Sequence, residues 1–298
     1  MKFQNSNTLD SLIDGDFIVL GGTGWFGTTA INLLLKSGIS KARIKVISRN
    51  RQQSQKWIDK NLQTLSYSQL KSTEVRKDSI ILNCTGINRH LIETLGSERF
   101  NIESNELREC VNELILKNPH ISSIHFSSGA SQFYDLKTDL YAFHKALDEA
   151  RYLKSTDNVS KLILVRAWSV TGGYVLNPDQ YMFSHLIKKK LLNEKVKITN
   201  PKTLRKFVSI EQVLLLSLFL TKNSGSMVLN TAGELIDIVS LAELVGCNFE
   251  VEAESNSLDN SYFTDDNSIF EIFNAHGIDY WDIARQIEET KFVLKSML

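Results

Sequence analysis

The sequence has little cysteine, little proline and no excess charge of either sign. Its 298 residues include three cysteines and three prolines. Cys84, Cys110 and Cys247 lie too far apart for a zinc-ligand motif, and their number is odd, so we expect neither a disulfide framework nor a metal site. The 34 Lys and Arg residues balance the 34 Asp and Glu residues, which argues against a dedicated nucleic-acid-binding protein.

Long apolar runs are also missing. No segment approaches about 18 consecutive apolar residues, and the polar N-terminal sequence MKFQNSNTLD lacks the apolar core of a signal peptide. The 42% hydrophobic content is that of a globular protein rather than a disordered chain. We therefore expect a cytoplasmic protein with no membrane partner.

The first half of the chain alternates short β-branched apolar runs with longer segments of helical periodicity. The sequence predicts strands at 17–20, 44–47, 79–82, 121–126 and 162–165, and helices at 25–35, 98–116 and 139–153. Strands separated by helices indicate parallel pairing with helical crossovers, and continuous apolar strands are typical of a sheet covered on both faces. The prediction is an α/β fold with a doubly wound parallel sheet of the Rossmann type.

After Arg166 this regularity fades, although 213–220 is strongly helical in pattern. We expect residues 1–167 to form the dinucleotide-binding domain and residues 168–298 a smaller, C-terminal substrate-binding lobe. Residues 206–232 are the part of that lobe that could return to the main sheet.

A glycine-rich loop, Gly-Gly-Thr-Gly-Trp-Phe-Gly, joins the first strand to the first helix. Gly21 would allow the tight turn, Gly24 would let the backbone approach a pyrophosphate, and Gly27 would let the helix pack closely on the strand. The helix N-terminus would offer its N–H groups to the phosphates. This placement predicts a dinucleotide site, with Trp25 and Phe26 in the core or over the cofactor.

The end of the second strand bears on which dinucleotide is bound. It reads Ser48-Arg49-Asn50-Arg51, with no acidic residue to accept hydrogen bonds from a ribose. Two guanidinium groups there suit a 2′-phosphate in charge and geometry. We therefore predict NADP as the cofactor, with NAD as the alternative. Arg51 has the weaker claim, and both arginines could instead be solvated.

Acid–base chemistry is suggested by Tyr141 and Lys145, which lie four residues apart in a predicted helix and so share a face. An ammonium near a phenol favours the phenolate, which can exchange a proton with a carbonyl or alcohol as hydride moves. Ser128 follows the preceding strand, and ligands bind beyond the carboxyl ends of such strands. Ser128 is thus the candidate to hold the reacting oxygen, ahead of Ser131, while His144 on another face is interpreted as structural.

Taken in order, these motifs resemble those of the extended short-chain dehydrogenase/reductase family, in its branch of nucleotide-sugar epimerases, dehydratases and reductases. The likeness runs from about Asp16 to Gly233. It implies that Tyr141 and Lys145 are the catalytic pair, with Lys145 also holding the nicotinamide ribose, and that Ser128 contacts substrate. It further implies cofactor contacts at Asn83, Cys84, Thr85, Gly86 and Asn101, and substrate contacts at Ser169 and Arg205.

Within that family the sequence favours one reaction over others. Dehydratases carry an Asp-Glu pair where this chain has Gly129-Ala130, and Ser169 replaces the asparagine that faces substrate. The leading hypothesis is reduction of a nucleotide-activated keto-sugar. The alternatives are an NAD-dependent nucleotide-sugar epimerase, a reductase of other carbonyl compounds and a non-catalytic dinucleotide sensor. The resemblance also implies a homodimer formed through the 98–116 and 139–153 helices.

Overall fold

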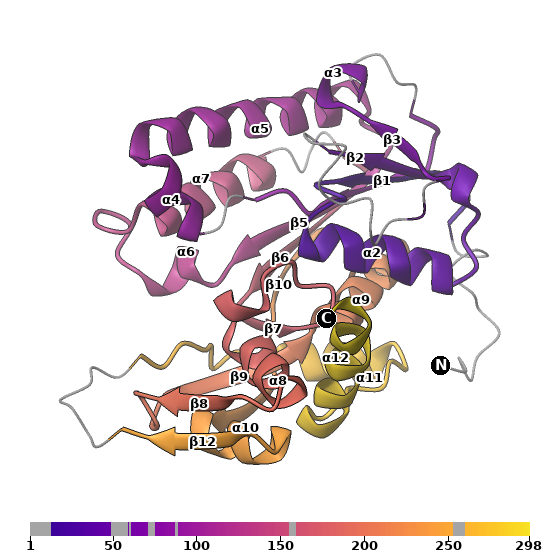
Figure 1. Ribbon diagram of the computed structural model, residues 1–298. Coiled ribbons are helices and arrows are strands. Elements are labelled where there is room, and N and C mark those ends of the chain that lie inside the picture. The colour runs from indigo at the N-terminus through magenta and orange to yellow at the C-terminus, as the bar shows by residue number, and fades with distance from the viewer. Residues whose placement is uncertain are drawn as a thin grey trace. The chain divides into compact units, whose positions relative to one another are not determined.

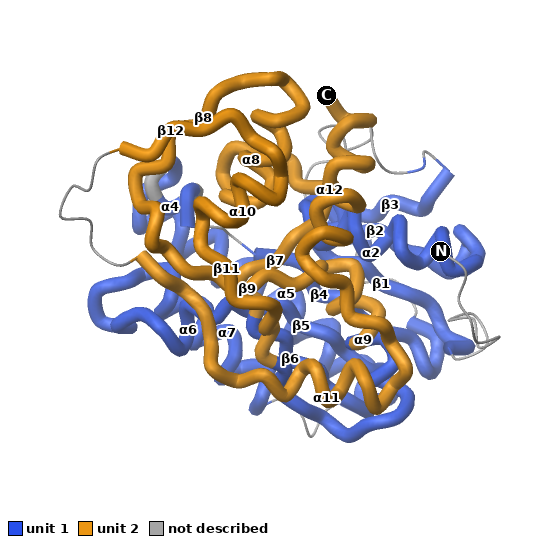
Figure 2. Tube along the Cα trace, turned by 90° about the horizontal axis from the view of Figure 1, so that it is seen from below, with its two compact units in different colours: residues 1–166, 217–229 blue, residues 167–216, 230–298 orange. Residues whose placement is uncertain are grey.

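The computed structural model describes residues 13–48, 59, 61–70, 75–86, 89–154, 159–252 and 260–298. The chain forms two compact units, which Figure 2 shows in different colours. The first comprises residues 1–166 and 217–229, and the second comprises residues 167–216 and 230–298. The chain therefore leaves the first unit after Arg166. It returns to that unit for the second half of one helix and most of one strand, and it ends in the second unit.

In its described residues, the first unit contains a seven-stranded sheet with the order β10-β6-β5-β4-β1-β2-β3. Its strands are β1 (Phe17–Leu20), β2 (Ile44–Ile47), β3 (Gln63–Leu65), β4 (Ile80–Asn83), β5 (Ser122–Ser128), β6 (Lys161–Ala167) and β10 (Met227–Asn230). β1 pairs in parallel with both β2 and β4. The strand order reverses there, and in open α/β sheets this reversal creates the ligand crevice at the carboxyl ends of the strands.

Helices cover both faces of this sheet (Figure 1). α5 (Ser97–Lys117) and α7 (Leu140–Lys154) lie on one face, and α2 (Trp25–Lys36) lies on the other. Ile18 and Leu20 of β1 join a buried cluster with Val111 and Ile115 of α5, because alternate strand residues point to the same face. The predicted α/β fold with a parallel Rossmann-type sheet is confirmed.

Shorter helices complete the first unit: η1 (Lys41–Arg43), α3 (Tyr67–Leu70), α4 (Arg89–Leu95) and α6 (Ala130–Phe133). α9 (Ile210–Asn223) brings the chain back from the second unit, and β10 adds a strand beside β6 at the edge of the sheet. Of the range 206–232, only its later part thus belongs to the main sheet.

The described second unit contains a three-stranded sheet of order β11-β9-β7 and a two-stranded sheet of β12 and β8. Its strands are β7 (Ser169–Thr171), β8 (Lys195–Ile198), β9 (Leu204–Ser209), β11 (Glu234–Asp237) and β12 (Asn248–Val251). Its helices are η3 (Pro178–Gln180), α8 (Met182–Leu191), α10 (Ile238–Val245), α11 (Ser268–Ala275) and α12 (Ile283–Met297). Across the whole described chain, no helix is both long and apolar enough to span a membrane.

Candidate active site

The glycine-rich loop makes a sharp turn over the end of β2. Gly21 has a φ of +69°, a conformation that glycine adopts without the strain that a side chain would bring. The backbone N–H groups of Gly21 and Gly22 both donate to the Ile47 carbonyl, at 3.0 and 3.2 Å. A Cβ added at Gly21 would lie only 2.9 Å from the Cys84 carbonyl oxygen, so the loop also abuts the end of β4.

The start of α2 packs closely on the glycine-rich loop. A Cβ on Gly27 would lie 2.3 Å from the Gly21 carbonyl oxygen, so only glycine permits this close packing. Gly24 is the N-cap and offers no side chain to cap the helix, and the first turn carries no acidic residue. The N–H groups of Trp25, Phe26 and Gly27 therefore suit a pyrophosphate, both by hydrogen bonding and by the helix dipole.

Trp25 and Phe26 are both half-buried beside this loop. Their rings meet edge to face at 5.4 Å, and Phe26 meets Phe126 of β5 at 5.2 Å in the same way. Phe26 therefore contributes to the packing of α2 against the sheet.

At the end of β2, Ser48 is buried and its hydroxyl lies 2.8 Å from that of Thr23 in the glycine loop. This contact ties the glycine-rich loop to the end of β2. Arg49 and Arg51, on which the preference for NADP depends, lie outside the described residues.

The end of β4 is held by a buried hydrogen-bond network around Asn83. The Thr85 backbone N–H donates to Asn83 Oδ1 at 3.2 Å, and the Thr85 hydroxyl donates to the same oxygen. Because the Thr85 backbone N–H can only donate, it fixes which atom of the Asn83 side-chain amide is the oxygen. The Asn83 Nδ2 group then donates to His125 Nδ1 and to the Tyr152 hydroxyl, each at 3.0 Å. With its side chain used internally, Asn83 could meet a dinucleotide only through its backbone.

Burial controls the charge of the groups in this network. It lowers the pKa of His125 to about 3, so the imidazole is neutral at neutral pH, in agreement with Nδ1 accepting from Asn83. Burial also raises the pKa of the neighbouring Cys84 thiol, which suits a packing residue and not a nucleophile.

Tyr141 and Lys145 lie one turn apart on α7, close to each other. The Lys145 ammonium lies 5.7 Å from the centroid of the Tyr141 ring. A Cβ added at Gly86, just beyond β4, would lie 3.0 Å from Lys145 Nζ. Lys145 is only 8% exposed. The structure therefore brings Lys145 together with the end of β4, which itself abuts the glycine loop at Cys84.

A second cation lies near Tyr141. The Arg89 guanidinium is 5.4 Å from the Tyr141 ring and 4.7 Å from the Tyr134 ring. It forms an ion pair of 2.6 Å with Asp139, whose other carboxylate oxygen accepts the N–H of Ala142 and so caps α7. No recognisable motif surrounds Arg89 in the sequence, and it was not predicted as a site residue.

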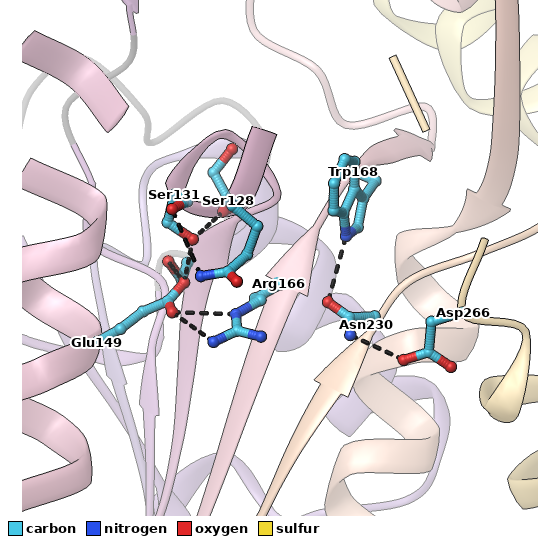
Figure 3. Close-up of polar contacts among 9 residues, drawn as sticks. Ser128, Ser131, Glu149, Arg166, Trp168, Asn230 and Asp266 are labelled. Carbon is cyan, nitrogen blue, oxygen red and sulfur yellow. Dashed lines mark hydrogen bonds and ion pairs between the residues drawn. The ribbon is translucent and has the colours of Figure 1, made fainter. Parts of the chain in front are cut away.

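Ser128 lies at the end of β5, where Figure 3 shows it beside Ser131, Glu149 and Arg166. Its hydroxyl accepts the N–H of Ala130 at 3.2 Å, and its carbonyl accepts the Ser131 hydroxyl at 2.9 Å. Ser131, the second candidate for the reacting oxygen, is turned toward Glu149 at 2.6 Å. Glu149 and Arg166 were not predicted from the sequence, although Glu149 continues the four-residue spacing of Tyr141 and Lys145.

Asn101 on α5 contacts α7 through His144. The His144 Nε2–H donates to Asn101 Oδ1 at 2.5 Å, and Arg108 donates to His144 Nδ1 at 3.1 Å. Arg108 also binds Asp148 at 2.5 Å. Burial and the nearby Arg108 charge lower the pKa of His144, in keeping with a structural histidine. A cavity of about 30 Å³ beside Arg108 and Asp148 has room for roughly one water molecule.

The remaining predicted residues, Ser169 and Arg205, belong to the second unit. Ser169 begins β7 and pairs with Phe207 of β9. The Arg205 guanidinium lies 5.8 Å from the Tyr262 ring, and its Nη1 donates to the carbonyls of Leu204 and Asn260 at 2.9 and 2.5 Å.

Close to Ser169 in the sequence, Trp168 is fixed by polar contacts that are visible in Figure 3. Its indole N–H donates to Asn230 Oδ1 at 3.3 Å, and the Asn230 amide donates to Asp266 at 2.8 Å. Trp168 also packs against Tyr262, with ring centroids 5.1 Å apart. Within this unit, aromatic and polar side chains thus gather around the start of β7. In the part of the chain that the structure describes, no cluster of His, Cys, Asp and Glu side chains suits a metal ion.

Comparison with solved structures identifies the fold. The UDP-N-acetylglucosamine 4-epimerase from Methanobrevibacter ruminantium M1, in complex with UDP-N-acetylmuramic acid, is similar with a TM-score of 0.77 and 16% identity over 96% of this chain and 100% of that chain. The Thermus thermophilus UDP-glucose 4-epimerase, in complex with NAD, gives 0.74 and 14% over 95% and 100%. The Bacillus anthracis dTDP-glucose 4,6-dehydratase, in complex with NAD, gives 0.71 and 14% over 94% and 96%.

These similarities extend over nearly the whole chain, so both units are included. The protein has the fold that these nucleotide-sugar epimerases and this dehydratase share, and the expected resemblance to the extended short-chain dehydrogenase/reductases is confirmed at the level of the fold. No protein-family model matches the chain, and no curated protein matches it in sequence.

Proposed function

We propose that the protein is an extended short-chain dehydrogenase/reductase that uses a nicotinamide dinucleotide to transfer hydride at a carbon of a nucleotide-activated sugar. The observation that supports this most is a series of close approaches within the first unit. Gly21 abuts Cys84, and Gly86 abuts Lys145. The loop suited to a pyrophosphate and Lys145 of α7 thus both approach the end of β4.

The chain's own groups fit such a dinucleotide. The N–H groups at the start of α2 would hold its pyrophosphate, and the ends of β2 and β4 would adjoin its ribose groups. When bound, the nicotinamide supplies the hydride acceptor or donor. Lys145 would hold the nicotinamide ribose, as its nearness to Gly86 permits.

Residues of α7 would transfer the proton, and a residue of β5 would orient the reacting oxygen. The Tyr141 hydroxyl would give a proton to a carbonyl oxygen or take one from an alcohol. The Lys145 ammonium, close to the Tyr141 ring, would stabilise the negative charge that develops on the reacting oxygens as the proton moves. The Ser128 hydroxyl would hydrogen-bond the reacting oxygen, which orients the sugar carbon for hydride transfer.

Reduction of a keto-sugar with NADPH is the first form of this proposal, because Arg49 and Arg51 follow the second strand where a 2′-phosphate would lie. NAD-dependent epimerisation is the second form. It is favoured by the fold shared over nearly the whole chain with UDP-sugar 4-epimerases. The two differ in whether hydride is consumed or returned to the same sugar.

The test begins with the dinucleotide content of the purified protein and its affinities for NADPH and NADH. A reductase should exchange its cofactor and oxidise NADPH with a UDP- or dTDP-4-ketohexose. An epimerase should retain NAD and interconvert UDP-glucose and UDP-galactose with no net oxidation. Tyr141→Phe should lower turnover by roughly 10²- to 10⁴-fold. Dinucleotide binding without turnover of any sugar or simpler carbonyl compound would instead support the non-catalytic sensor.

We propose that Ser169 and Arg205 of the second unit bind the substrate. Arg205 would hold the diphosphate of the nucleotide sugar by charge-assisted hydrogen bonds. Free UDP and dTDP should then compete with substrate. Arg205→Gln should weaken UDP binding by roughly 10-fold or more, with NADPH affinity unchanged. Equal UDP affinity in the variant would remove Arg205 from the site.

We also propose that α5 and α7 form a homodimer interface, since Ile102 of α5 and Phe143 of α7 are 53% and 45% exposed. Light scattering of the purified protein should give the mass of a dimer, and Phe143→Asp should give that of a monomer. A monomeric unaltered protein would contradict this.

A further inference from the structure

One acidic side chain of α7 is not used in the proposed chemistry, yet it lies on the same face as the residues that are. Glu149 follows Lys145 by four residues and Tyr141 by eight, so all three lie along one side of the helix. Glu149 is 4% exposed. A buried carboxylate is costly unless its oxygens are paired and hydrogen-bonded, so its partners show what holds it there.

Both oxygens of the Glu149 carboxylate are bound within the first unit. Oε1 accepts the Ser127 hydroxyl at 2.7 Å and the Ser131 hydroxyl at 2.6 Å. Oε2 accepts Nε and Nη2 of Arg166 at 3.0 and 2.8 Å. Figure 3 shows the Arg166 guanidinium on one side of the carboxylate and Ser131 on the other. The ion pair with Arg166 therefore fixes the carboxylate while its second oxygen faces the end of β5.

The two serines that Glu149 binds lie on either side of Ser128 in the sequence. Ser127 and Ser128 are consecutive residues of β5, and the Ser128 hydroxyl accepts the Ala130 N–H. Anchoring Ser127 to Glu149 thus fixes the end of the strand from which Ser128 projects. The Ser131 hydroxyl, bound to Glu149, also lies 2.9 Å from the Ser128 carbonyl, so the short segment 127–131 is held on both sides of Ser128.

We propose that Glu149 is a positioning residue for Ser128. It acts through the hydroxyls of Ser127 and Ser131 and is itself held by Arg166. This inference rests on the proposed function, in which Ser128 orients the reacting oxygen. Glu149 touches no reacting group. Its contribution is to keep the Ser128 hydroxyl at the place where the proposed chemistry needs it.

The kinetic test compares Glu149→Gln in two backgrounds. A glutamine removes the charge that pairs with Arg166. Its amide N–H₂ either faces Arg166, which also only donates, or reverses the hydrogen bonds with the two serine hydroxyls. In the otherwise unaltered protein, with NADPH and the 4-ketohexose that it reduces best, we expect kcat to fall roughly 10- to 100-fold with little change in KM. In the Ser128→Ala background the same substitution should lower kcat by less than about threefold, because contacts that act through one group are not additive.

Ser123→Ala is the matched control. Ser123 is buried on the same strand, and its hydroxyl has no hydrogen-bond partner within the described chain. Its removal should leave kcat unchanged. Where Glu149→Gln fails to fold, Ser131→Ala is the substitute, since it removes one hydroxyl and keeps the ion pair. An equal loss of kcat in both backgrounds would show that Glu149 does not act through Ser128 and would overturn the proposal.

A crystal structure of Glu149→Gln, or of Ser131→Ala where Glu149→Gln does not fold, tests the positioning of Ser128 in the absence of substrate. The proposal expects the Ser128 hydroxyl to move out of hydrogen-bonding distance of the Ala130 N–H, which it meets at 3.2 Å in the unaltered protein. Retention of that hydrogen bond would overturn the proposal. Failure of the proposed function has a different signature: Tyr141→Phe or Ser128→Ala would then leave turnover intact.

Discussion

Gly27 packs directly against the backbone of the glycine-rich loop. In Gly27→Ala the new Cβ would meet the Gly21 carbonyl oxygen at 2.3 Å and the Gly22 Cα at 2.6 Å. Both are backbone atoms, so the loop itself must shift. We expect the free energy of unfolding to fall by about 1–3 kcal/mol, as measured by urea denaturation, and NADPH binding to weaken in the same variant.

Gly225→Ala is the control for Gly27→Ala, because a Cβ at Gly225 would meet no atom within 4 Å. It should change stability by less than about 0.5 kcal/mol. Equal stability and equal NADPH affinity in the two variants would contradict the close packing of α2 on the loop.

Gly86 tests the contact between the end of β4 and Lys145. A Cβ at Gly86 would lie 3.0 Å from Lys145 Nζ, and the end of a flexible side chain can move aside. Gly86→Ala should therefore change stability by less than about 0.5 kcal/mol while lowering kcat roughly 10-fold. Thermal unfolding and steady-state kinetics measure the two effects separately. Unchanged turnover would mean that the position of Lys145 is not critical.

His125 gives the fold a dependence on pH. Burial lowers its pKa to about 3 in the folded protein, against about 6.5 in an unfolded chain. Between these values only the unfolded state binds the proton, so stability decreases as pH falls. The contribution is about 1.4 kcal/mol per pH unit below about pH 6.5.

The variant His125→Phe isolates this effect. A phenyl ring keeps the stacking on Tyr152, where the two rings are 3.9 Å apart, and removes the titration. Urea unfolding at about pH 7 and about pH 5 should show a smaller loss in the variant than in the unaltered protein. His144, whose pKa is also lowered, contributes to both proteins and cancels in the comparison. Equal losses would show that His125 becomes protonated without unfolding.

At the scale of secondary structure, α7 depends on its first turn to present Tyr141. Asp139 Oδ1 accepts the Ala142 N–H at 2.8 Å, and Asp139 also pairs with Arg89 at 2.6 Å. Asp139→Ala should lower the free energy of unfolding by about 1 kcal/mol. Asp139→Asn keeps a good cap and loses only a half-exposed ion pair, so its cost should be at most about 0.5 kcal/mol. Chemical denaturation of both variants checks the order.

Elements with strong local signals were predictable, and those that depend on distant partners were not. β1 and β2 occupy the predicted residues, because each is a continuous apolar run. β5 runs two residues beyond its predicted end at Phe126, through Ser127 and Ser128. Serines at a strand end indicate a turn in sequence, and here Ser127 is bound by Glu149, a residue of α7.

The residues of the candidate site also divide into those that local sequence patterns predict and those that depend on distant partners. The four-residue spacing of Tyr141 and Lys145 sufficed to predict that they lie close together on α7, and Lys145 also lies near Gly86 beyond the end of β4. The partners of Glu149 lie 17 to 22 residues away along the chain, so only the packing of α7 on β5 and β6 reveals them. No spacing rule connects a helix residue to hydroxyls on a strand.

At the scale of the whole molecule, the path of the chain could not be predicted in full. β10 completes the sheet of the first unit beside β6, although residues 167–216 of the second unit precede it. The smaller sheets of the second unit pair segments about 50 residues apart, such as β8 and β12. Such long-range pairing leaves little trace in local periodicity.

A fragment of residues 1–167 tests this arrangement. Without β10 it would expose the edge of β6, whose residues Leu162, Ile163, Leu164 and Val165 are all buried in the full chain. Exposed apolar edge strands promote association. We expect the fragment to elute as oligomers or aggregates in size-exclusion chromatography. A monomeric fragment that unfolds with the cooperativity and midpoint of the full chain would contradict a structural need for β10.

Two sides of α7 make contacts within the first unit, which limits the substitutions that this helix can accept. One side carries Tyr141, Lys145 and Glu149, and the adjoining side binds α5 through His144 and Asp148. Only a narrow band that includes Phe143 and Ala150 is left exposed in the single chain, and the proposed dimer would cover Phe143. In a saturation mutagenesis screen scored on folding of the chain alone, substitutions in α7 should therefore be tolerated in a repeating pattern of about one position in every turn.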